Sequence, residues 1–262
     1  MSILVKLGGT LLDAPESRER LAGQIAAARG RGEKIVVVHG GGKQMTRYLA
    51  ERGIESRFVN GLRVTTPETL DAVLKVFAGS VNHELVASLN RAGALAVGLS
   101  GIDALLTEAE PMDPQLGAVG RVVRSNAALL ELLTANRYVP VVACVAGDRA
   151  GRVYNVNADQ MAVACAAAFH ARQLIFLTDV EGVLDATRQV RSVLTAAEGE
   201  SLMESGVATG GMYAKLKAAI AALNGGVEQV RVAPGAADRV LELILAGEPV
   251  GTRLVLGEGR AA

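Results

Sequence analysis

The sequence predicts an α/β fold, a three-layer αβα sandwich around a mainly parallel sheet. Short runs of β-branched residues alternate along the chain with longer stretches rich in alanine and leucine. The short runs are apolar throughout instead of alternating with polar residues, which is typical of strands buried on both faces. Because helices separate the strands, we expect crossover connections and therefore a parallel sheet covered by helices on both sides.

These runs predict the following elements. Strands are expected at residues 3–7, 34–38, 95–99, 139–145, 173–178 and 228–233. Helices are expected around residues 16–30, 42–52, 67–91, 126–135, 158–170, 211–224 and 236–246.

Two regions interrupt the alternation. Residues 104–125 resemble two strands with a turn between them, and residues 152–156 form another short extended piece. We interpret both as hairpins at the rim of the sheet. The chain has no linker rich in proline or serine, so we expect a single domain over residues 1–262. Within it we expect an N-terminal lobe of about residues 1–170 and a C-terminal lobe of about residues 171–262.

The composition excludes several classes of partner. Lysine plus arginine and aspartate plus glutamate both total 27, so the net charge is zero, and neither nucleic acid nor an anionic membrane is expected to bind. No apolar run approaches the roughly 18 residues that a membrane-spanning helix needs, and no signal peptide is recognisable. Cys144 and Cys165 lie in apolar stretches without metal-ligand spacing, as buried thiols in a reducing compartment would. We therefore expect a cytoplasmic protein.

Glycine and acidic residues gather at the ends of predicted strands. Ligands of open α/β sheets bind where the carboxyl ends of the strands meet helix N-termini. Four strand ends carry such residues, namely KLGGT (6–10), HGGGK (39–43), LSG (99–101) and TDVEG (178–182).

The stretch HGGGK is not a nucleotide-binding P-loop. Aligning the motif's final GK on Gly42 and Lys43 places Val37 where its first glycine belongs and Gln44 where its serine or threonine belongs. A dinucleotide fingerprint fails too, because Met45 occupies the place of its last glycine. Two glycine-lined strand ends can instead hold a transferring phosphoryl group from two sides. The alternative is that both are only tight turns between a strand and a helix.

Two lysines and one aspartate are candidates for that phosphoryl site. Lys6 lies inside an apolar strand, where its ammonium must either reach a polar site or extend to water. Lys215 falls one turn into a predicted helix, whereas Lys217 points to a different face. Asn157 is expected to cap the helix that begins after it, and Asp159 in its first turn can either complement the helix dipole or hold lysines in place.

Six stretches together resemble the amino-acid kinase family. They are KLGGTLLD (6–13), VVVHGGGKQ (36–44), NGLRVT (60–65), YNVNADQ (154–160), TDVEGVLD (178–185) and TGGMYAKLKAA (209–219). The resemblance is collinear from residue 3 to about residue 256. Within the family the chain is most similar to the branch that phosphorylates the side-chain carboxylate of N-acetyl-L-glutamate with ATP, the second step of arginine biosynthesis.

The resemblance implies a role for each matching residue. It implies an N-terminal lobe that binds the acceptor and forms the dimer, and a C-terminal lobe that binds ATP. The implied catalytic residues are Lys6, Lys215 and Asp159, with Gly8 and Gly9 facing the phosphoryl group. The implied substrate-binding residues are Gly41, Gly42, Arg63 and Asn155. The implied ATP-binding residues are Asp179, Val180, Glu181, Gly182, Val183, Leu184 and Thr209.

The residue types suit this chemistry. A carboxylate acceptor is already ionised and needs no general base, so the transfer depends on in-line positioning and on neutralising charge on the phosphoryl oxygens. Lysines, backbone amides and Mg²⁺ provide that neutralisation. We expect ATP and Mg²⁺ as cofactors, with the metal held mainly by the ATP phosphates and water rather than by protein ligands. None of His39, His83 and His170 is required.

Some residues depart from the family pattern and leave alternatives open. Ile102 and Ala104 stand where many relatives carry lysine and glycine, and Lys43 stands where proline is frequent. The chain begins only a few residues before KLGG, without the N-terminal helix of arginine-inhibited relatives, so we expect a homodimer without arginine feedback. The acceptor could instead be N-succinylglutamate or a carrier-bound aminoadipate or glutamate. A non-catalytic ligand-binding homologue is a further alternative.

Overall fold

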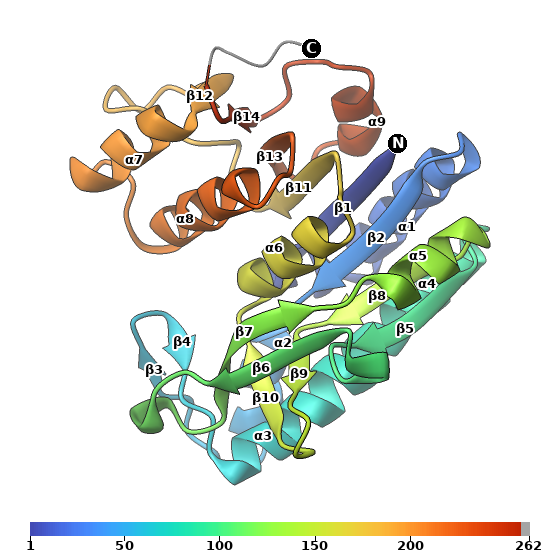
Figure 1. Cartoon of the computed structure of the whole chain (residues 1–262), viewed down its shortest axis with the longest axis vertical. Coiled ribbons are helices and arrows are strands. Elements are labelled where there is room, and N and C mark those ends of the chain that lie inside the picture. The colour runs from blue at the N-terminus through green and yellow to red at the C-terminus, as the bar shows by residue number, and fades with distance from the viewer. Residues whose placement is uncertain (258–262) are drawn as a thin grey trace.

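The computed structural model describes residues 1–257 and is organised around one eight-stranded sheet (Figure 1). Its strands lie in the order β12-β14-β13-β11-β1-β2-β8-β5, and every neighbouring pair is parallel except β13 and β14. The predicted mainly parallel sheet is therefore confirmed. The strands are β1 Ser2–Leu7, β2 Lys34–His39, β5 Ala96–Ser100, β8 Val139–Ala143, β11 Gln173–Thr178, β12 Val193–Thr195, β13 Gln229–Pro234 and β14 Thr252–Val255.

The middle strands of this sheet form the core. Every residue of β8 and β11 is buried, and in β1 only Ser2 is partly exposed. Burial on both faces explains why these strands read as continuous apolar runs. It also makes each polar side chain within them conspicuous, because it must find a partner away from bulk water.

Helices cover both faces of the sheet, as the sandwich prediction requires (Figure 1). One face is covered by helices that contact one another in the pairs α1–α4 and α1–α9. The other is covered by α5, α6, α8 and α7, with contacts between α6 and α8 and between α7 and α8. The helices are α1 Pro15–Gly30, α2 Gly42–Ala50, α3 Pro67–Val73, α4 Asn82–Arg91, α5 Ala128–Ala135, α6 Ala158–Ala168, α7 Ala196–Glu204, α8 Gly210–Asn224 and α9 Val240–Leu245.

The predicted rim hairpins do not belong to the main sheet. They form a second, closed sheet in the order β10-β7-β6-β9, with β6 Thr107–Pro111, β7 Val119–Ser125, β9 Val145–Gly147 and β10 Val153–Val156. The strand expected at 139–145 is interrupted at Cys144, so that β8 stays in the main sheet while β9 joins the small one. β10 pairs with β7, although the two strands lie far apart along the chain. Pairing over such a distance cannot be recognised from the pattern of neighbouring residues.

Several further elements differ from the sequence prediction. The helix expected at 67–91 is a continuous helical run in three segments, α3, a π-helical turn at Leu74–Val81, and α4. Short strands β12 and β14 were not predicted, nor were α7 and the hairpin β3 Phe58–Val59 with β4 Leu62–Arg63. Strands of two to four residues carry too little periodicity to be recognised. Three short 3₁₀ turns complete the described chain, at Gly9–Leu12, Asp103–Leu105 and Pro114–Leu116.

Helices of the described residues are too short or too polar to cross a lipid bilayer.

Candidate active site

Lys6 and Asp159 form a buried ion pair at the carboxyl end of β1. Their Nζ and Oδ1 atoms are 2.6 Å apart, and each residue is only 8% exposed. Within residues 1–257 that oxygen accepts no hydrogen bond of suitable angle, so the contact is an ion pair rather than an aligned hydrogen bond. The ammonium is therefore held in place without having all its donors engaged.

Local sequence explains how Asp159 reaches this position. Asn157 is the N-cap of α6, and its side chain accepts hydrogen bonds from the backbone of Asp159 at 2.9 Å and Gln160 at 3.3 Å. The predicted cap is confirmed. α6 packs against β1, β2 and β11, so its first turn presents Asp159 to the middle of the sheet. The positive end of the α6 dipole further favours a carboxylate there.

The two glycine-rich loops meet beside this ion pair. A Cβ added to Gly9 would lie 3.1 Å from the amide nitrogen of Gly42, and one added to Gly8 would lie 3.2 Å from the carbonyl oxygen of Leu177. At Gly41 a Cβ would lie 2.9 Å from the ring of Phe77, but at Gly42 it would meet only open space. Glycine at the first three positions therefore allows close backbone approach, and Gly42 leaves room in front of the α2 N-terminus.

A buried polar network that the sequence analysis missed supports the second loop. His39 is fully buried, and its Nδ1 lies 2.8 Å from the carbonyl oxygen of Gly40. Since that oxygen can only accept, Nδ1 carries the proton and Nε2 accepts from Asn82, at 2.9 Å. Burial lowers the pKa of His39 to about 4, so the ring is neutral near pH 7.

Asn82 joins this network to the neighbouring strands. Its amide also donates to the carbonyl oxygen of Val141 in β8, at 2.9 Å, and a Cβ on Gly98 in β5 would lie 2.1 Å from its Oδ1. The strand ends of β2, β8 and β5 are therefore joined through one side chain. An asparagine on the apolar face of a predicted helix was the signal that could have revealed it.

Arg63, one of the predicted substrate-binding residues, contacts the second glycine loop. Arg63 is 8% exposed, and burial lowers its pKa from the usual value, although an arginine remains charged. Its guanidinium donates to Ser56, to Thr46 Oγ1 at 2.9 Å and to the Gly42 carbonyl at 3.2 Å. A pocket of about 640 Å³ opens here, lined by Gly9, Thr10, Gly42, Lys43, Thr46, Arg47, Ala50, Phe58 and Arg63.

Asn155 is fixed from the small closed sheet. Its amide donates to Thr65 Oγ1 at 3.0 Å, and Thr65 follows the β3–β4 hairpin directly. The predicted substrate-side residues thus come from three separate chain segments that lie close together. Lys43, exposed at the mouth of the pocket, makes no ion pair within residues 1–257.

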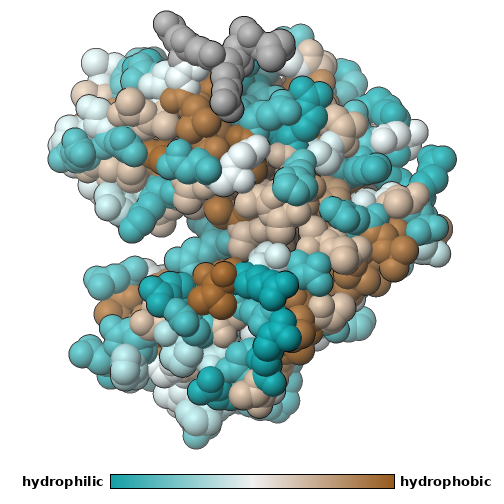
Figure 2. All heavy atoms as spheres, in the orientation of Figure 1, coloured by the Kyte–Doolittle hydropathy of each residue, from teal (hydrophilic) through white to brown (hydrophobic). Residues whose placement is uncertain are grey.

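The predicted nucleotide-side residues lie in the loop after β11 and at the start of α8. Asp179, Val180, Glu181 and Leu184 are exposed in the loop after β11, whereas Gly182 and Val183 are buried beneath it. Thr209 is the exposed N-cap residue of α8. The surface is hollowed between α8 and the region of the β3–β4 hairpin (Figure 2).

Lys215 is the predicted catalytic residue that the structure does not bring into contact with the others. It is partly exposed on α8, and no carboxylate within residues 1–257 pairs with it. Lys217 is exposed and, two residues further along the same helix, points to a different side, as predicted. α8 packs on α6, the helix that carries Asp159.

No group of three or more His, Cys, Asp or Glu side chains in the described part of the chain is arranged to hold a metal ion. Asp159, beside the glycine loops, is engaged with Lys6.

Comparison with known proteins gives consistent similarities. The profile of the Amino acid kinase family matches residues 1–234. The acetylglutamate kinase of Solibacter usitatus (strain Ellin6076) is 72% identical over 255 residues, covering 97% of this chain and 99% of that protein. The acetylglutamate kinase of Rhizobium johnstonii is 41% identical over 268 residues, covering 97% and 91%. A crystal structure of N-acetylglutamate synthase from Neisseria gonorrhoeae, complexed with coenzyme A and N-acetyl-glutamate, superposes with a TM-score of 0.87 at 26% identity, covering 97% of this chain and 59% of that chain.

Proposed function

Because this chain belongs to the amino acid kinase family, we propose that it transfers the γ-phosphoryl group of ATP to the side-chain carboxylate of N-acetyl-L-glutamate. The product is an acyl phosphate, and the reaction is the second step of arginine biosynthesis. The observation that carries the proposal is the Lys6–Asp159 pair beside two touching glycine loops, in a chain 72% identical to an acetylglutamate kinase.

The chemistry requires no proton transfer. An oxygen of the side-chain carboxylate attacks the γ-phosphorus, and the bond from that phosphorus to the bridging oxygen of ADP breaks with its electron pair. Charge accumulates on the transferred group and on the leaving oxygen, so catalysis depends on positioning and neutralisation. The neutral, fully hydrogen-bonded His39 fits a site in which no imidazole acts as a base.

We assign the neutralising charges to Lys6 and Lys215. Lys6 is already held by Asp159 at the carboxyl end of β1, next to the amides of Gly8 and Gly9. Lys215 lies on α8 across the hollow, so it reaches the phosphoryl group only when the two sides approach each other. Closure of this kind would also exclude water from the acyl phosphate.

The acceptor is proposed to lie between Gly41–Gly42, Arg63 and Asn155. The donors of Arg63 that now serve Ser56 and Thr46 would turn to the α-carboxylate, which suits the planar fork of an arginine. Asn155 would bind the acyl amide by exchanging its hydrogen bond to Thr65. The open space at Gly42 leaves room for the reacting carboxylate.

ATP is proposed to bind along residues 179–184 with Thr209, on the C-terminal lobe of about residues 171–262. The acceptor would lie on the N-terminal lobe of about residues 1–170. Mg²⁺ would arrive on the ATP phosphates and supply further positive charge at the transferred group. Both cysteines are free and buried, which supports a reducing, cytoplasmic setting.

We propose that the protein is a homodimer joined along the free edge of the main sheet. β5 is the last strand of the sheet, and the exposed Leu95, Tyr138 and Leu132 lie at or near its amino end. Hydrophobic side chains gather on this side, over α5 (Figure 2). Such an edge is normally covered. Light scattering should give twice the chain mass, and Leu132→Lys should lower it toward that of one chain.

The acceptor is tested by trapping the acyl phosphate with hydroxylamine in the presence of ATP. N-acetylglutamate, N-succinylglutamate, glutamate and N-acetyl-aminoadipate should be compared. We expect the highest kcat/KM with N-acetylglutamate, in line with the identity to acetylglutamate kinases. A higher kcat/KM with another acceptor, or no trapped product with any, would overturn the assignment.

A further inference from the structure

The π-helical turn Leu74–Val81 packs against the second glycine loop, residues 39–42, and the start of α2. The backbone amide of Asn82 donates to the carbonyl oxygen of Phe77, five residues back, which is the bonding pattern of a π-helix. In an α-helix two residues at this spacing would point about 140° apart around the axis. Here Phe77, Val81 and Asn82 are all buried and all face the glycine loop.

Two side chains of the π turn enclose Gly41. A Cβ added to Gly41 would lie 2.9 Å from Cδ1 of Phe77 and 3.3 Å from Cγ2 of Val81. From α6, Cβ of Ala158 would lie 3.4 Å from a Cβ added to Gly40. The loop is therefore held between the π turn and the first residue of α6, and both glycines are buried.

Asn82 fixes the histidine that precedes these glycines. Its side-chain nitrogen lies 2.9 Å from Nε2 of His39 and 2.9 Å from the carbonyl oxygen of Val141, so both amide hydrogens have acceptors. Because Nε2 of His39 accepts, the proton is on Nδ1, which lies 2.8 Å from the carbonyl oxygen of Gly40. Asn82 therefore selects the imidazole tautomer that donates to this carbonyl.

Holding the Gly40 carbonyl also orients the amide of Gly41. The two groups belong to one planar trans peptide and point in opposite directions, so this amide points away from His39. The nitrogens of Gly41 and Gly42 lie 3.6 Å and 3.1 Å from a Cβ added to Gly9 of the first glycine loop. Within residues 1–257 neither amide donates to a backbone carbonyl, so both are available to an acceptor oxygen.

We propose that Asn82 is a positioning residue of the phosphoryl transfer, a role that rests on the proposed acceptor. Acting through His39, it holds the amides of Gly41 and Gly42 toward the side-chain carboxylate of that acceptor. The π turn supplies a second constraint, because its buried side chains pack on the loop. Asn82 is itself buried behind the loop, and its effect is to place the two donors before the acceptor binds.

The test measures acceptor binding separately from turnover. Isothermal titration calorimetry on the full chain gives the dissociation constant of N-acetyl-L-glutamate, and the hydroxylamine assay gives the KM of each substrate. Asn82→Leu should raise the dissociation constant and the KM of the acceptor about tenfold, the effect of misplacing one hydrogen-bond donor, and leave the KM of ATP within about twofold. A purely structural role would lower the folded fraction and kcat but leave both KM values unchanged. The matched control is Asn90→Leu, at an exposed asparagine of the same helix, which should bind the acceptor as the unmodified chain does.

Two histidine variants test the same step if Asn82→Leu does not fold. The amide nitrogen of an asparagine lies where Nδ1 of a histidine lies, so His39→Asn can still donate to the Gly40 carbonyl. The longer side chain of His39→Gln places its amide near Asn82 instead, and we expect it to bind the acceptor more weakly than His39→Asn does.

The outcomes separate this role from the proposed function. An acceptor dissociation constant that Asn82→Leu leaves unchanged, an equal rise in the KM of ATP, or equal acceptor binding by the two histidine variants would overturn the positioning role alone. No binding of N-acetyl-L-glutamate by the unmodified chain would overturn the proposed acceptor and this role with it.

Discussion

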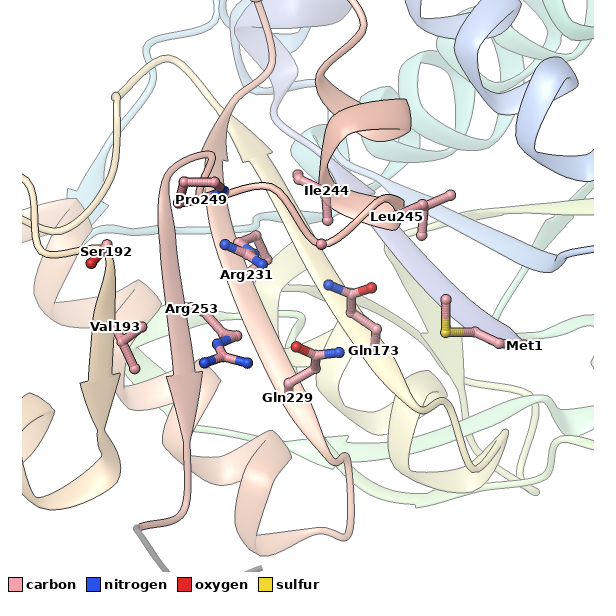
Figure 3. Close-up of a pocket in the computed structure, with 11 residues that line it drawn as sticks. Met1, Gln173, Ser192, Val193, Gln229, Arg231, Ile244, Leu245, Pro249 and Arg253 are labelled. Atoms are coloured by element: carbon pink, nitrogen blue, oxygen red, sulfur yellow. The ribbon is translucent and has the colours of Figure 1, made fainter. Parts of the chain in front are cut away.

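The sheet contains two buried cations whose surroundings are opposite. Lys6 on β1 is paired with Asp159 at 2.6 Å, whereas Arg231 on β13 lies beside a second arginine and has no described carboxylate near it. Both are at least 92% buried, so burial does not distinguish them. The difference is where the compensating charge comes from. At Lys6 the chain supplies it, whereas at Arg231 no carboxylate of residues 1–257 does (Figure 3).

The contrast has a functional meaning. A lysine paired with a carboxylate of the same chain is positioned before any substrate binds. Stabilisation of a transition state requires this kind of preorganised charge. An arginine without such a partner instead leaves a buried charge that costs folding stability. Five predictions break or sharpen this comparison, from the largest expected effect to the smallest.

Removing the proposed catalytic lysines should have the largest effect. Lys6→Ala and Lys215→Ala should each lower kcat by about 10³-fold with the fold retained, because each removes charge stabilisation in the transition state. Lys217→Ala, one of the exposed lysines of α8, is the matched control and should be mild. Steady-state kinetics with the hydroxylamine assay measure this. Inactivity of Lys217→Ala with an active Lys215→Ala would show that the wrong helix face has been assigned.

Breaking the ion pair should cost folding stability. Asp159→Asn leaves Lys6 buried without its carboxylate, so we expect the free energy of unfolding to fall by about 3 kcal/mol. Urea unfolding at pH 7.5 measures it, and Glu33→Gln, which removes an acid from a more exposed ion pair with Met1, should change it by less than about 1 kcal/mol. Equal losses of unfolding free energy in both variants would mean that burial does not make the Lys6–Asp159 pair more important for stability than the exposed pair.

The neutral His39 predicts a loss of stability in acid. Its pKa is about 4 in the folded chain and about 6.5 when unfolded, so only the unfolded state takes up this proton between those values. This contribution to stability is complete above about pH 6.5 and falls by up to about 3 kcal/mol as the pH approaches 4. His39→Gln should flatten that part of the pH profile, while His83→Gln, at an exposed site, should not. An unchanged slope in His39→Gln would mean that other groups cause the acid sensitivity.

Removing the unmatched cation should have the opposite sign. In chloride buffer, Arg231→Met should raise the free energy of unfolding by about 1 kcal/mol, because it removes a buried charge and the repulsion from Arg253. The control Arg121→Met, which removes an exposed arginine paired with Glu110, should stay within about 0.5 kcal/mol. Urea unfolding measures both. A clear destabilisation by Arg231→Met would show that Arg231 stabilises the fold, as the Lys6–Asp159 pair does.

The smallest effect concerns a residue that departs from the family pattern. Ala104 has φ of 51°, in the left-handed region that favours glycine. Ala104→Gly should therefore stabilise the chain by about 0.5 kcal/mol, after allowing for the added flexibility of the unfolded state. Ala135→Gly at the end of α5 should instead destabilise it. A thermal shift assay distinguishes the two signs, and destabilisation in both would mean that the Ala104 backbone is not strained.

Much of the architecture could be predicted from the sequence. Continuous apolar runs predicted β1, β2, β8, β11 and β13, because strands buried on both faces need apolar residues at nearly every position. An apolar run also predicted β5, although this edge strand is only partly buried. The edge strand β12 and its neighbour β14 were missed since they are three and four residues long. The small closed sheet was missed because pairing between β7 and β10 joins segments separated by a helix and two strands.

The candidate site was predictable in part. The residues Lys6, Asp159 and the glycine loops were singled out by type and position, but the sequence left open whether Lys6 meets an acid or extends to water. The His39–Asn82 network was not anticipated, because its two members lie on different elements and neither belongs to a motif. Arg231 was passed over, although a cation within an apolar strand raised the same question at Lys6.

By itself the sequence determined the layers of this protein and the residue types at the carboxyl ends of its strands, since period and composition act over neighbouring residues. Only the tertiary structure decided which buried charges have partners. Asp159 reaches Lys6 because α6 packs on β1, and Arg231 faces Arg253 because β14 turns antiparallel beside β13. Partners of this kind depend on packing between distant segments, and no local pattern records them.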